Sequence, residues 1–277
     1  MYALICRVLL LILLSPFIQA HVFAASGLGS GLALAGAAED GRVPILLYHR
    51  FGPTVADGMT IKTQVFAEHL RYLQENGYTV IPLRRLVDYL AGRATAPGPK
   101  SVVIVEDDAH KSVYSDMLPL VKKYRVPVTV FVYPSAISNA SYAMTWDQLR
   151  ELKKTGLFDI QSHTFWHPNF KREKRKLSAA QYARLVDTQL RKAKSRLEKE
   201  LGGTVDYLAW PFGIYDAELE RMAGAAGYVA AFTIERRHAA KGDRLLAIPR
   251  YLLVNADQGA SFRQLLEGRA VQRNIVY

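Results

Sequence analysis

The chain has 277 residues, half of them hydrophobic, with one cysteine and a formal net charge of +11. This length can bury a large core, and a single cysteine excludes a disulfide framework. The most basic stretches are Lys171–Lys176 and Arg191–Lys199, but the second contains Glu198 and is followed by Glu200, which is typical of a solvated helix face. We therefore expect no nucleic-acid partner, and only peripheral contact between this basic surface and an anionic envelope or polysaccharide.

The first 25 residues have the three-part plan of a secretory signal peptide. Met1–Arg7 carries one positive charge, Val8–Ala20 is almost entirely apolar, and small residues follow. The apolar stretch is shorter than the roughly 20 residues that a membrane span needs, so an uncleaved anchor is the less favoured alternative. We expect a signal peptide over 1–25, a flexible Gly/Ala-rich linker over 26–42 and one domain over 43–277, exported to the periplasm or secreted.

Strands and helices alternate along the rest of the chain. Strands are expected over 43–49, 78–81, 101–106, 127–133, 158–161, 205–209, 228–233 and 246–254. Helices are expected over 63–76, 83–91, 112–124, 145–154, 178–201, 216–226 and from 261 onward. Thr63 is the expected cap of the first helix, and Thr145 with Gln148 and Ser178 with Gln181 form capping-box patterns.

This alternation with short connections predicts an α/β fold with parallel strands and crossover helices. The sheet is then either a closed barrel or doubly wound. No glycine-rich phosphate loop follows the first strand, which disfavours a nucleotide as ligand.

An acidic cluster follows the most apolar of the predicted strands. The run Ser101–Val105 ends in Glu106, Asp107 and Asp108. Carboxylates crowded at the end of a buried strand repel one another and lose hydration, so they need a compensating metal ion, cation or proton-transfer role. A single Asp here would more simply cap the next helix, but an adjacent pair exceeds what a cap requires.

Other polar side chains are expected at the same edge of the sheet, because the carboxyl ends of parallel strands meet on one face. They are His49, His163, His167 and Arg250. A lone histidine is usually a packing residue, but two histidines four residues apart beside an Asp pair have the donor set of Zn²⁺ or a similar metal. Glu does not follow His163, so the zincin motif is absent. A metal ion, a carboxylate that acts as base and a histidine that acts as acid together suit amide hydrolysis.

Three of these motifs together resemble the polysaccharide deacetylase family (NodB-homology domains, carbohydrate esterase family 4). They are the strand ending in Asp107–Asp108, the sequence SHTFWHP at 162–168 and WPFG at 210–213. The resemblance implies a distorted (β/α)7 barrel with a single catalytic domain, and removal of acetyl groups from a glycan with one divalent metal ion. Zn²⁺ is the first candidate, with Co²⁺ or Ni²⁺ as alternatives. The chain is most similar to the permuted poly-β-1,6-N-acetylglucosamine deacetylase subgroup, and we expect a monomer that acts on an acetylated glycan.

The resemblance also implies a role for each matching residue. Asp107 matches the catalytic base, and the metal ligands are Asp108, His163 and His167. In the permuted subgroup an early histidine is the acid, which makes His49 the candidate, and Arg250 would hold Asp107. Residues expected to contact substrate are Trp166, Trp210, Pro211 and Phe212, with the backbone N–H of Phe212 directed at the oxyanion. For the two tryptophans, simple packing is an equal alternative.

The chain departs from the family pattern near the acidic pair. Glu106 and Ala109 replace a phenylalanine and a glycine, Ala209 replaces an arginine, and the usual late histidine motif is absent. His110 adds a titratable group without an assigned role. The changes at Glu106, Ala109 and Ala209 favour one alternative, a non-catalytic glycan-binding protein on the same fold. Another metal-dependent C–N hydrolase, acting on a small substrate, is a further alternative.

Overall fold

The structure is a computed structural model that describes residues 41–270. The predicted signal peptide and nearly all of the predicted linker lie outside the described residues, as does the segment 271–277. Within 41–270, no helix is both long enough and apolar enough to cross a membrane.

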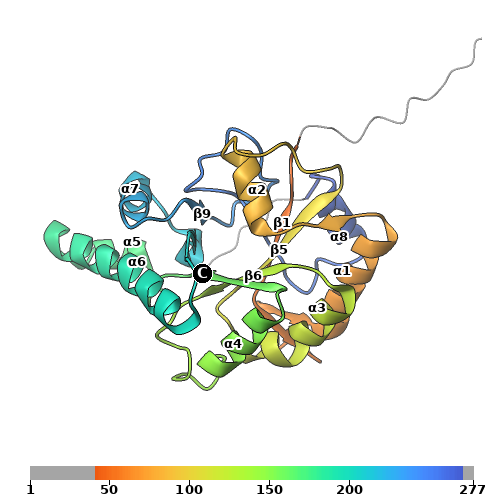
Figure 1. The fold of residues 1–277 in the computed structure, drawn as a ribbon, viewed down its shortest axis with the longest axis horizontal. Coiled ribbons are helices and arrows are strands. Elements are labelled where there is room, and N and C mark those ends of the chain that lie inside the picture. The colour runs from red at the N-terminus through yellow and green to blue at the C-terminus, as the bar shows by residue number, and fades with distance from the viewer. Residues whose placement is uncertain (1–40, 271–277) are drawn as a thin grey trace, which may run out of the picture. The chain divides into compact units, whose positions relative to one another are not determined.

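One parallel sheet forms the centre of the described part of the chain (Figure 1). Along its path the strands are β10 (Tyr251–Leu252), β1 (Ile45–Tyr48), β5 (Ser101–Asp107), β6 (Val128–Val132), β7 (Phe158–Ser162), β8 (Tyr207–Ala209) and β9 (Ala230–Phe232). A short strand, β4 (Thr79–Val80), also pairs with the start of β5.

The segment 248–252 joins the two edges of this sheet. Ile248 forms a parallel bridge with Phe232 of β9, and Tyr251 and Leu252 then pair with β1. The sheet therefore curls into a seven-stranded barrel whose seam is made by this one segment. The prediction of a distorted (β/α)7 barrel is confirmed, and the doubly wound alternative is wrong.

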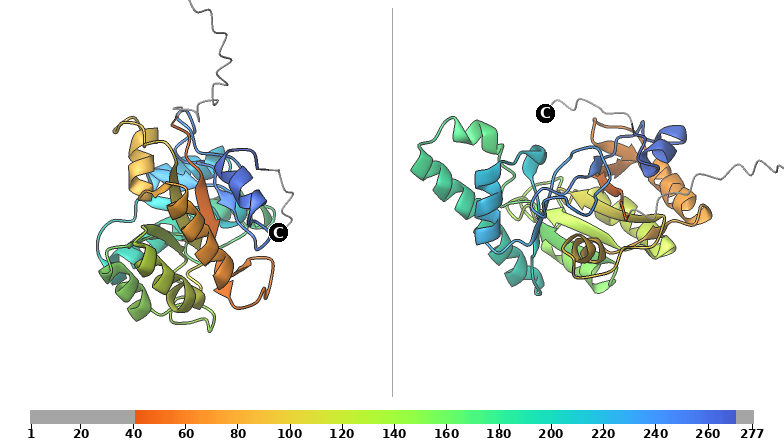
Figure 2. Two further views of the ribbon diagram at one scale, coloured as in Figure 1. Left: turned by 90° about the vertical axis from the view of Figure 1, so that its right-hand side faces the viewer. Right: turned by 90° about the horizontal axis from the view of Figure 1, so that it is seen from above.

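Helices follow most of the strands and cover the outside of the sheet (Figures 1 and 2). They are α1 (Thr63–Glu75), α2 (Leu83–Leu90), α3 (Leu118–Tyr124), α4 (Trp146–Lys154), α5 (Phe170–Lys174), α6 (Ala179–Leu201), α7 (Ala217–Ala225) and α8 (Ala260–Leu266), with a π-helical turn η1 (Val113–Met117) and a 3₁₀ turn η2 (Pro211–Gly213). Both predicted capping boxes are present, at Thr145 and at Ser178.

Some local predictions were wrong. Thr63 is the first residue of α1 rather than its cap, and its hydroxyl donates to Asp116 instead. The helix predicted over 112–124 is divided into η1 and α3, because Pro119 has no N–H to continue the regular hydrogen-bond ladder. The small parallel pair β2 (Arg50–Gly52) and β3 (Thr60–Lys62) was not predicted either.

Alternate residues of each strand belong to two different buried clusters, as the strand period of two requires. Val103 and Val105 of β5 pack with residues such as Phe131 and Phe232 from other strands, and this cluster fills the barrel. Ile104 belongs to the larger cluster between the sheet and the helices. The same alternation places Asp107 on the inner face of β5.

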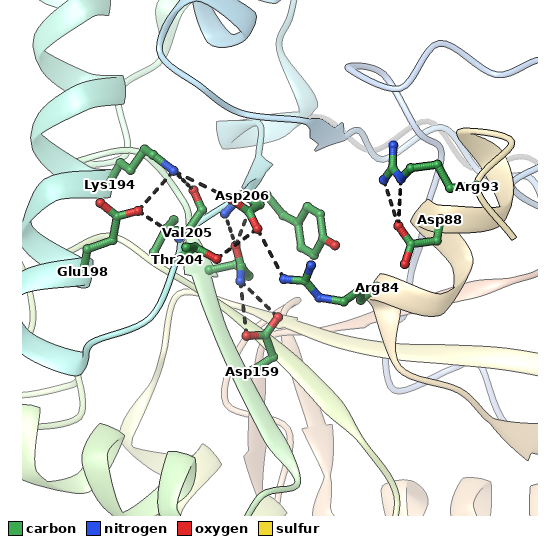
Figure 3. Close-up of polar contacts among 11 residues, drawn as sticks. Arg84, Asp88, Arg93, Asp159, Lys194, Glu198, Thr204, Val205 and Asp206 are labelled. Carbon is green, nitrogen blue, oxygen red and sulfur yellow. Dashed lines mark hydrogen bonds and ion pairs between the residues drawn. The ribbon is translucent and has the colours of Figure 1, made fainter.

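A polar network ties the elements together at the amino-terminal end of β8 (Figure 3). The side-chain oxygen of Gln161 accepts from the backbone N–H groups of Asp206 and Tyr207, at 2.9 and 2.8 Å. Asp206 also pairs with Arg84 of α2 at 3.3 Å, and Lys194 of α6 donates to the carbonyl of Val205. These contacts lie at the end of the strand opposite to the acidic cluster and are structural.

Candidate metal centre

Asp107 and Arg250 form a buried, two-pronged ion pair at the carboxyl end of β5. Nη1 of Arg250 donates to Oδ1 of Asp107 at 2.8 Å, and Nη2 donates to Oδ2 at 2.9 Å. Nε of Arg250 donates to the carbonyl oxygen of Thr233 at 2.9 Å. Since all three nitrogens are bonded, the guanidinium has one orientation, and Asp107 has one too.

This pairing determines the charge of Asp107. Burial acts to raise its pKa, but the positive charge of Arg250, followed by interactions with His163, outweighs burial and lowers the pKa to about 2. Asp107 is therefore ionised at neutral pH.

Three potential metal ligands lie beside this pair. Asp108, His163 and His167 each offer one ligand atom, and these atoms all lie within 4.8 Å of one another. Two imidazoles and one carboxylate, with coordination positions left for water or substrate, match the donor set of a hydrolytic Zn²⁺ site. The side chains present thus fit a divalent cation.

The surroundings of His163 fix which of its nitrogens is available. Nδ1 lies 2.8 Å from the carbonyl oxygen of Ala209, and a carbonyl can only accept, so Nδ1 carries the proton. Nε2 then presents its lone pair 3.8 Å from Oδ1 of Asp108 and 3.7 Å from Oδ2 of Asp107. A backbone carbonyl bonded to the far nitrogen is the usual support of a metal-binding histidine.

His167 is held by a turn in the left-handed region. Thr164 and His167 have φ values of 65° and 62°, and the hydroxyl of Thr164 accepts from the backbone N–H of His167 at 3.2 Å. The side-chain oxygen of Gln189 on α6 accepts from the backbone N–H of Phe165 and of Trp166. Burial, followed by the interaction with His163, lowers the pKa of His167 to about 3, so its imidazole is neutral at pH 7, the form that binds metal.

His49 directly follows β1 and is half-buried. Burial lowers its pKa, while the negative charges of Asp108 and Asp107 oppose that shift. Its Nδ1 is buried and has no hydrogen-bond partner among the described residues. His49 therefore lies within the electrostatic field of the acidic pair and retains a nitrogen for a further partner.

The residues of the WPFG motif differ in how deeply they are buried. The ring of Phe212 lies 4.5 Å from the ring of His167 between centroids, and Phe212 is partly exposed with φ 57°. Trp210 is only 1% exposed, its indole N–H donates to the carbonyl of Leu246 at 2.9 Å, and Pro211 is also buried. Trp210 and Pro211 thus pack in the core, which for Trp210 is the alternative that the sequence left open. Trp166, by contrast, is 48% exposed.

Glu106 and His110 flank the acidic pair without joining the ligand cluster. Glu106 is fully buried, and burial followed by the charges of Asp108 and Asp107 raises its pKa well above the usual range. The ring of His110 lies parallel to that of Tyr142, and its Nδ1 is 2.8 Å from the hydroxyl of Ser112.

Two residues at the site were not identified from the sequence. Tyr133 lies 5.5 Å from His167 and 6.4 Å from His163 between ring centroids, and its hydroxyl is 2.9 Å from that of Tyr142. Tyr133 directly follows β6, so the rule that identified the other strand-end residues also applied to it. Gln189 lies in the middle of α6, where no local pattern marks a residue that supports a distant loop.

The chain is similar to known polysaccharide deacetylases. Residues 94–231 match the family model described as polysaccharide deacetylase. The poly-beta-1,6-N-acetyl-D-glucosamine N-deacetylase of Staphylococcus aureus is 24% identical over 200 residues, which cover 70% of this chain and 68% of that protein.

Solved structures give the same result for the fold. IcaB from Ammonifex degensii has 26% sequence identity and a TM-score of 0.72, covering 83% of this chain and 97% of that one. The deacetylase PplD of Streptococcus pyogenes has 22% identity and a TM-score of 0.73, covering 81% and 98%.

Proposed function

This chain belongs to the polysaccharide deacetylase family, and we propose that it removes acetyl groups from an N-acetylglucosamine-containing exopolysaccharide in a metal-dependent reaction. The observation that carries the proposal is the ionised, rigidly held Asp107 directly beside the three-ligand cluster. A glycan-binding protein without activity would have no need to keep a buried charge pair at this point.

Asp108, His163 and His167 would hold the metal ion, with Zn²⁺ as the first candidate and Co²⁺ or Ni²⁺ as alternatives. When bound, such an ion supplies Lewis acidity, which makes water more acidic and polarises a carbonyl group. Side chains and backbone groups of the protein would supply the base, the acid and the hydrogen-bond donor to the oxyanion.

Asp107 would accept the proton of the attacking water. Its pKa of about 2 keeps it ionised, and Arg250 aims its two oxygens. Oδ2 lies 3.7 Å from Nε2 of His163, so the base faces the space that the ligands enclose. Arg250 acts through Asp107 and is a positioning residue.

His49 would protonate the leaving amine. Burial lowers the pKa of His49 and the charges of Asp108 and Asp107 oppose that shift, and its buried Nδ1 has no hydrogen-bond partner among the described residues. The backbone N–H of Phe212 would donate to the oxyanion, the role that the family resemblance implies, and the ring of Phe212 lies 4.5 Å from that of His167 between centroids.

The substrate is proposed to be an acetylated glycan outside the cytoplasm. The name of the S. aureus relative supports an N-acetylglucosamine polymer, and the partly exposed rings of Trp166 and Phe212 offer apolar faces for sugar rings. The predicted signal peptide supports export to the periplasm or beyond. We further propose that the protein acts as a monomer, whose basic surface favours contact with an anionic envelope.

Acetate release tests the reaction. Protein starting near residue 26 would be freed of metal, reloaded with Zn²⁺, Co²⁺ or Ni²⁺, and supplied with poly-N-acetylglucosamine, chitin oligomers, peptidoglycan and acetylated xylan. If acetate is released from an N-acetylglucosamine polymer only when the metal is present, the result supports the proposal. Stoichiometric metal without acetate from any of these glycans would favour the glycan-binding alternative.

A further inference from the structure

The metal-ligand candidate Asp108 belongs to a turn that is unfavourable for its own residues. Asp108 and Ala109 have φ values of 87° and 54°, so two consecutive non-glycine residues occupy the left-handed region. L-residues reach this region only at a cost in free energy, which glycine avoids. The turn therefore needs contacts that hold it.

Backbone bonds supply part of that support. The N–H of Asp108 donates to the carbonyl of Phe131 at 3.1 Å, and the carbonyl of Ala109 accepts from the N–H of Met144 at 3.0 Å. The remaining N–H of the turn, that of Ala109, donates to a side chain, Oε2 of Glu106, at 3.2 Å. The carboxyl group of Glu106 also interacts with the backbone N–H of His110.

Glu106 is separated from the ligand cluster by the sheet itself. It is paired in register with Tyr48 of β1 and Val130 of β6, and both of these pack in the cluster between the sheet and the helices. Asp107 lies on the opposite face, and the candidate ligands do not include Glu106. Its carboxyl group can thus reach the backbone of the turn but has no place in the reaction.

We propose that Glu106 is a positioning residue, which braces the left-handed turn at Ala109 and thereby places Asp108 for the metal. A buried carboxyl beside two aspartates is costly, so its presence calls for a compensating contact. The only such contact that the described residues provide is to the turn, because the other oxygen, Oε1, has no partner among them. Glu106 and Ala109 then form a pair, in which the side chain stabilises a conformation that a glycine would adopt unaided. The inference rests on the metal site of the proposed function.

A double-mutant cycle with Zn²⁺ affinity as the readout tests this pair. Glu106→Leu removes the acceptor at similar volume, and we expect it to weaken Zn²⁺ binding about 10- to 100-fold, the usual effect of losing an outer-shell support. Glu106→Gln keeps an acceptor oxygen and should stay within about twofold of the parent. In an Ala109→Gly background, Glu106→Leu should cost little, because glycine needs no brace. Affinity would be measured by competition with a chromophoric chelator.

Two results would overturn the brace. One is a Glu106→Gln protein that loses as much affinity as Glu106→Leu. The other is an Ala109→Gly background in which Glu106→Leu costs as much as in the parent. This second comparison remains available if Glu106→Leu alone does not fold. A parent that binds no Zn²⁺ would refute the metal site instead, and the brace would then be judged by whether the same two substitutions are non-additive in urea unfolding.

Discussion

Arg250 and Asp107 are separated by 143 positions in the chain, yet they form two parallel hydrogen bonds of 2.8 and 2.9 Å. The guanidinium is fully buried and also lies over the ring of Phe131, 5.4 Å from its centroid. The pair joins the last strand of the barrel to the acidic end of β5. The charge state and the orientation of the proposed base thus depend on the closure of the barrel.

Loss of Arg250 should therefore be costly for both stability and activity. Arg250→Met leaves Asp107 buried without a partner, so we expect the free energy of unfolding to fall by about 3–5 kcal/mol and turnover to be lost. Arg250→Lys keeps the charge but not the fork, and should be intermediate. Arg244→Met is the matched control: Arg244 is exposed and pairs with Glu220, so about 1 kcal/mol or less is expected. Urea unfolding measures all three, and equal losses for Arg250 and Arg244 would contradict the prediction.

Asp107→Asn tests the base. Turnover of the glycan should fall about 10²- to 10⁴-fold or more, because no group remains to accept the proton of water. Zn²⁺ should still bind with the parent's affinity, since Asp107 is not among the candidate ligands. Acetate release and metal content of the same preparation give both numbers. A variant that keeps its turnover would exclude Asp107 as the base.

The substitution His49→Asn distinguishes the proposed role of His49 as acid from that of Asp107 as base. An amine leaving group must be protonated, so acetate release from the glycan should fall about 10²- to 10⁴-fold. A nitrophenyl acetate ester needs no such proton, and its hydrolysis should change little in His49→Asn while it falls in Asp107→Asn. Equal losses on both substrates in His49→Asn would mean that His49 has another role.

Substitution of Trp166 should affect substrate binding, whereas substitution of Trp210 should affect stability. Trp166 is 48% exposed, and Trp166→Ala should raise KM for a glycan polymer about 2- to 10-fold with stability unchanged. Trp210→Ala should lower the free energy of unfolding by about 3–5 kcal/mol, because a buried ring is lost. Val229→Ala, at an exposed site just before β9, is a control that should alter neither quantity. A rise in KM for Val229→Ala would show that the effect at Trp166 is not local.

His69 makes stability depend on pH at a place remote from the proposed ligands. Its Nε2–H donates to the carbonyl of Asp257 at 2.6 Å, and its Nδ1 accepts from the hydroxyl of Tyr48 at 3.0 Å. Its ring is stacked on Phe262, and burial lowers its pKa from 6.5 to about 4. The folded state therefore binds the proton less readily than the unfolded chain does.

This difference in proton affinity determines the direction in which folding stability changes with pH. As the pH falls below 6.5, protonation of His69 in the unfolded chain destabilises the fold, by about 3 kcal/mol once the pH reaches 4. His69→Gln retains a donor and an acceptor but does not titrate, so it should lose about 3 kcal/mol less than the parent between pH 7 and pH 4. Parallel urea titrations of metal-free protein measure this, and identical pH profiles would contradict the assignment.

The sequence predicted the site better than its surroundings, for a physical reason. Strand ends are marked locally, by apolar runs that stop in polar residues, and parallel strands bring those ends to one face. This is why Asp107, Asp108, His163 and His167 could be found without a structure. The contact of Arg250 with Asp107 was predicted only through the family resemblance.

What the sequence could not predict depends on contacts made at long range. Trp210 has the same local context as a sugar-binding residue, and only the carbonyl of Leu246, contributed by a distant loop, shows that its indole belongs inside. Gln189 is a similar case, because its function depends on which loop the helix meets. The prediction of one continuous helix after Ser112 was a local error, because Pro119 could be read from the sequence.

The seam of the barrel is also the part of the sheet that is synthesised last. The segment 248–252 carries Arg250 and is synthesised after every other strand of the sheet. A chain that ends before residue 248 lacks Arg250, whose positive charge lowers the pKa of Asp107 in the complete sheet. Without this segment, β9 and β1 lose the pairing through which the sheet closes. We therefore expect a chain truncated before residue 248 to lose both the closure of the sheet and the partner of the proposed base, because one short segment supplies both.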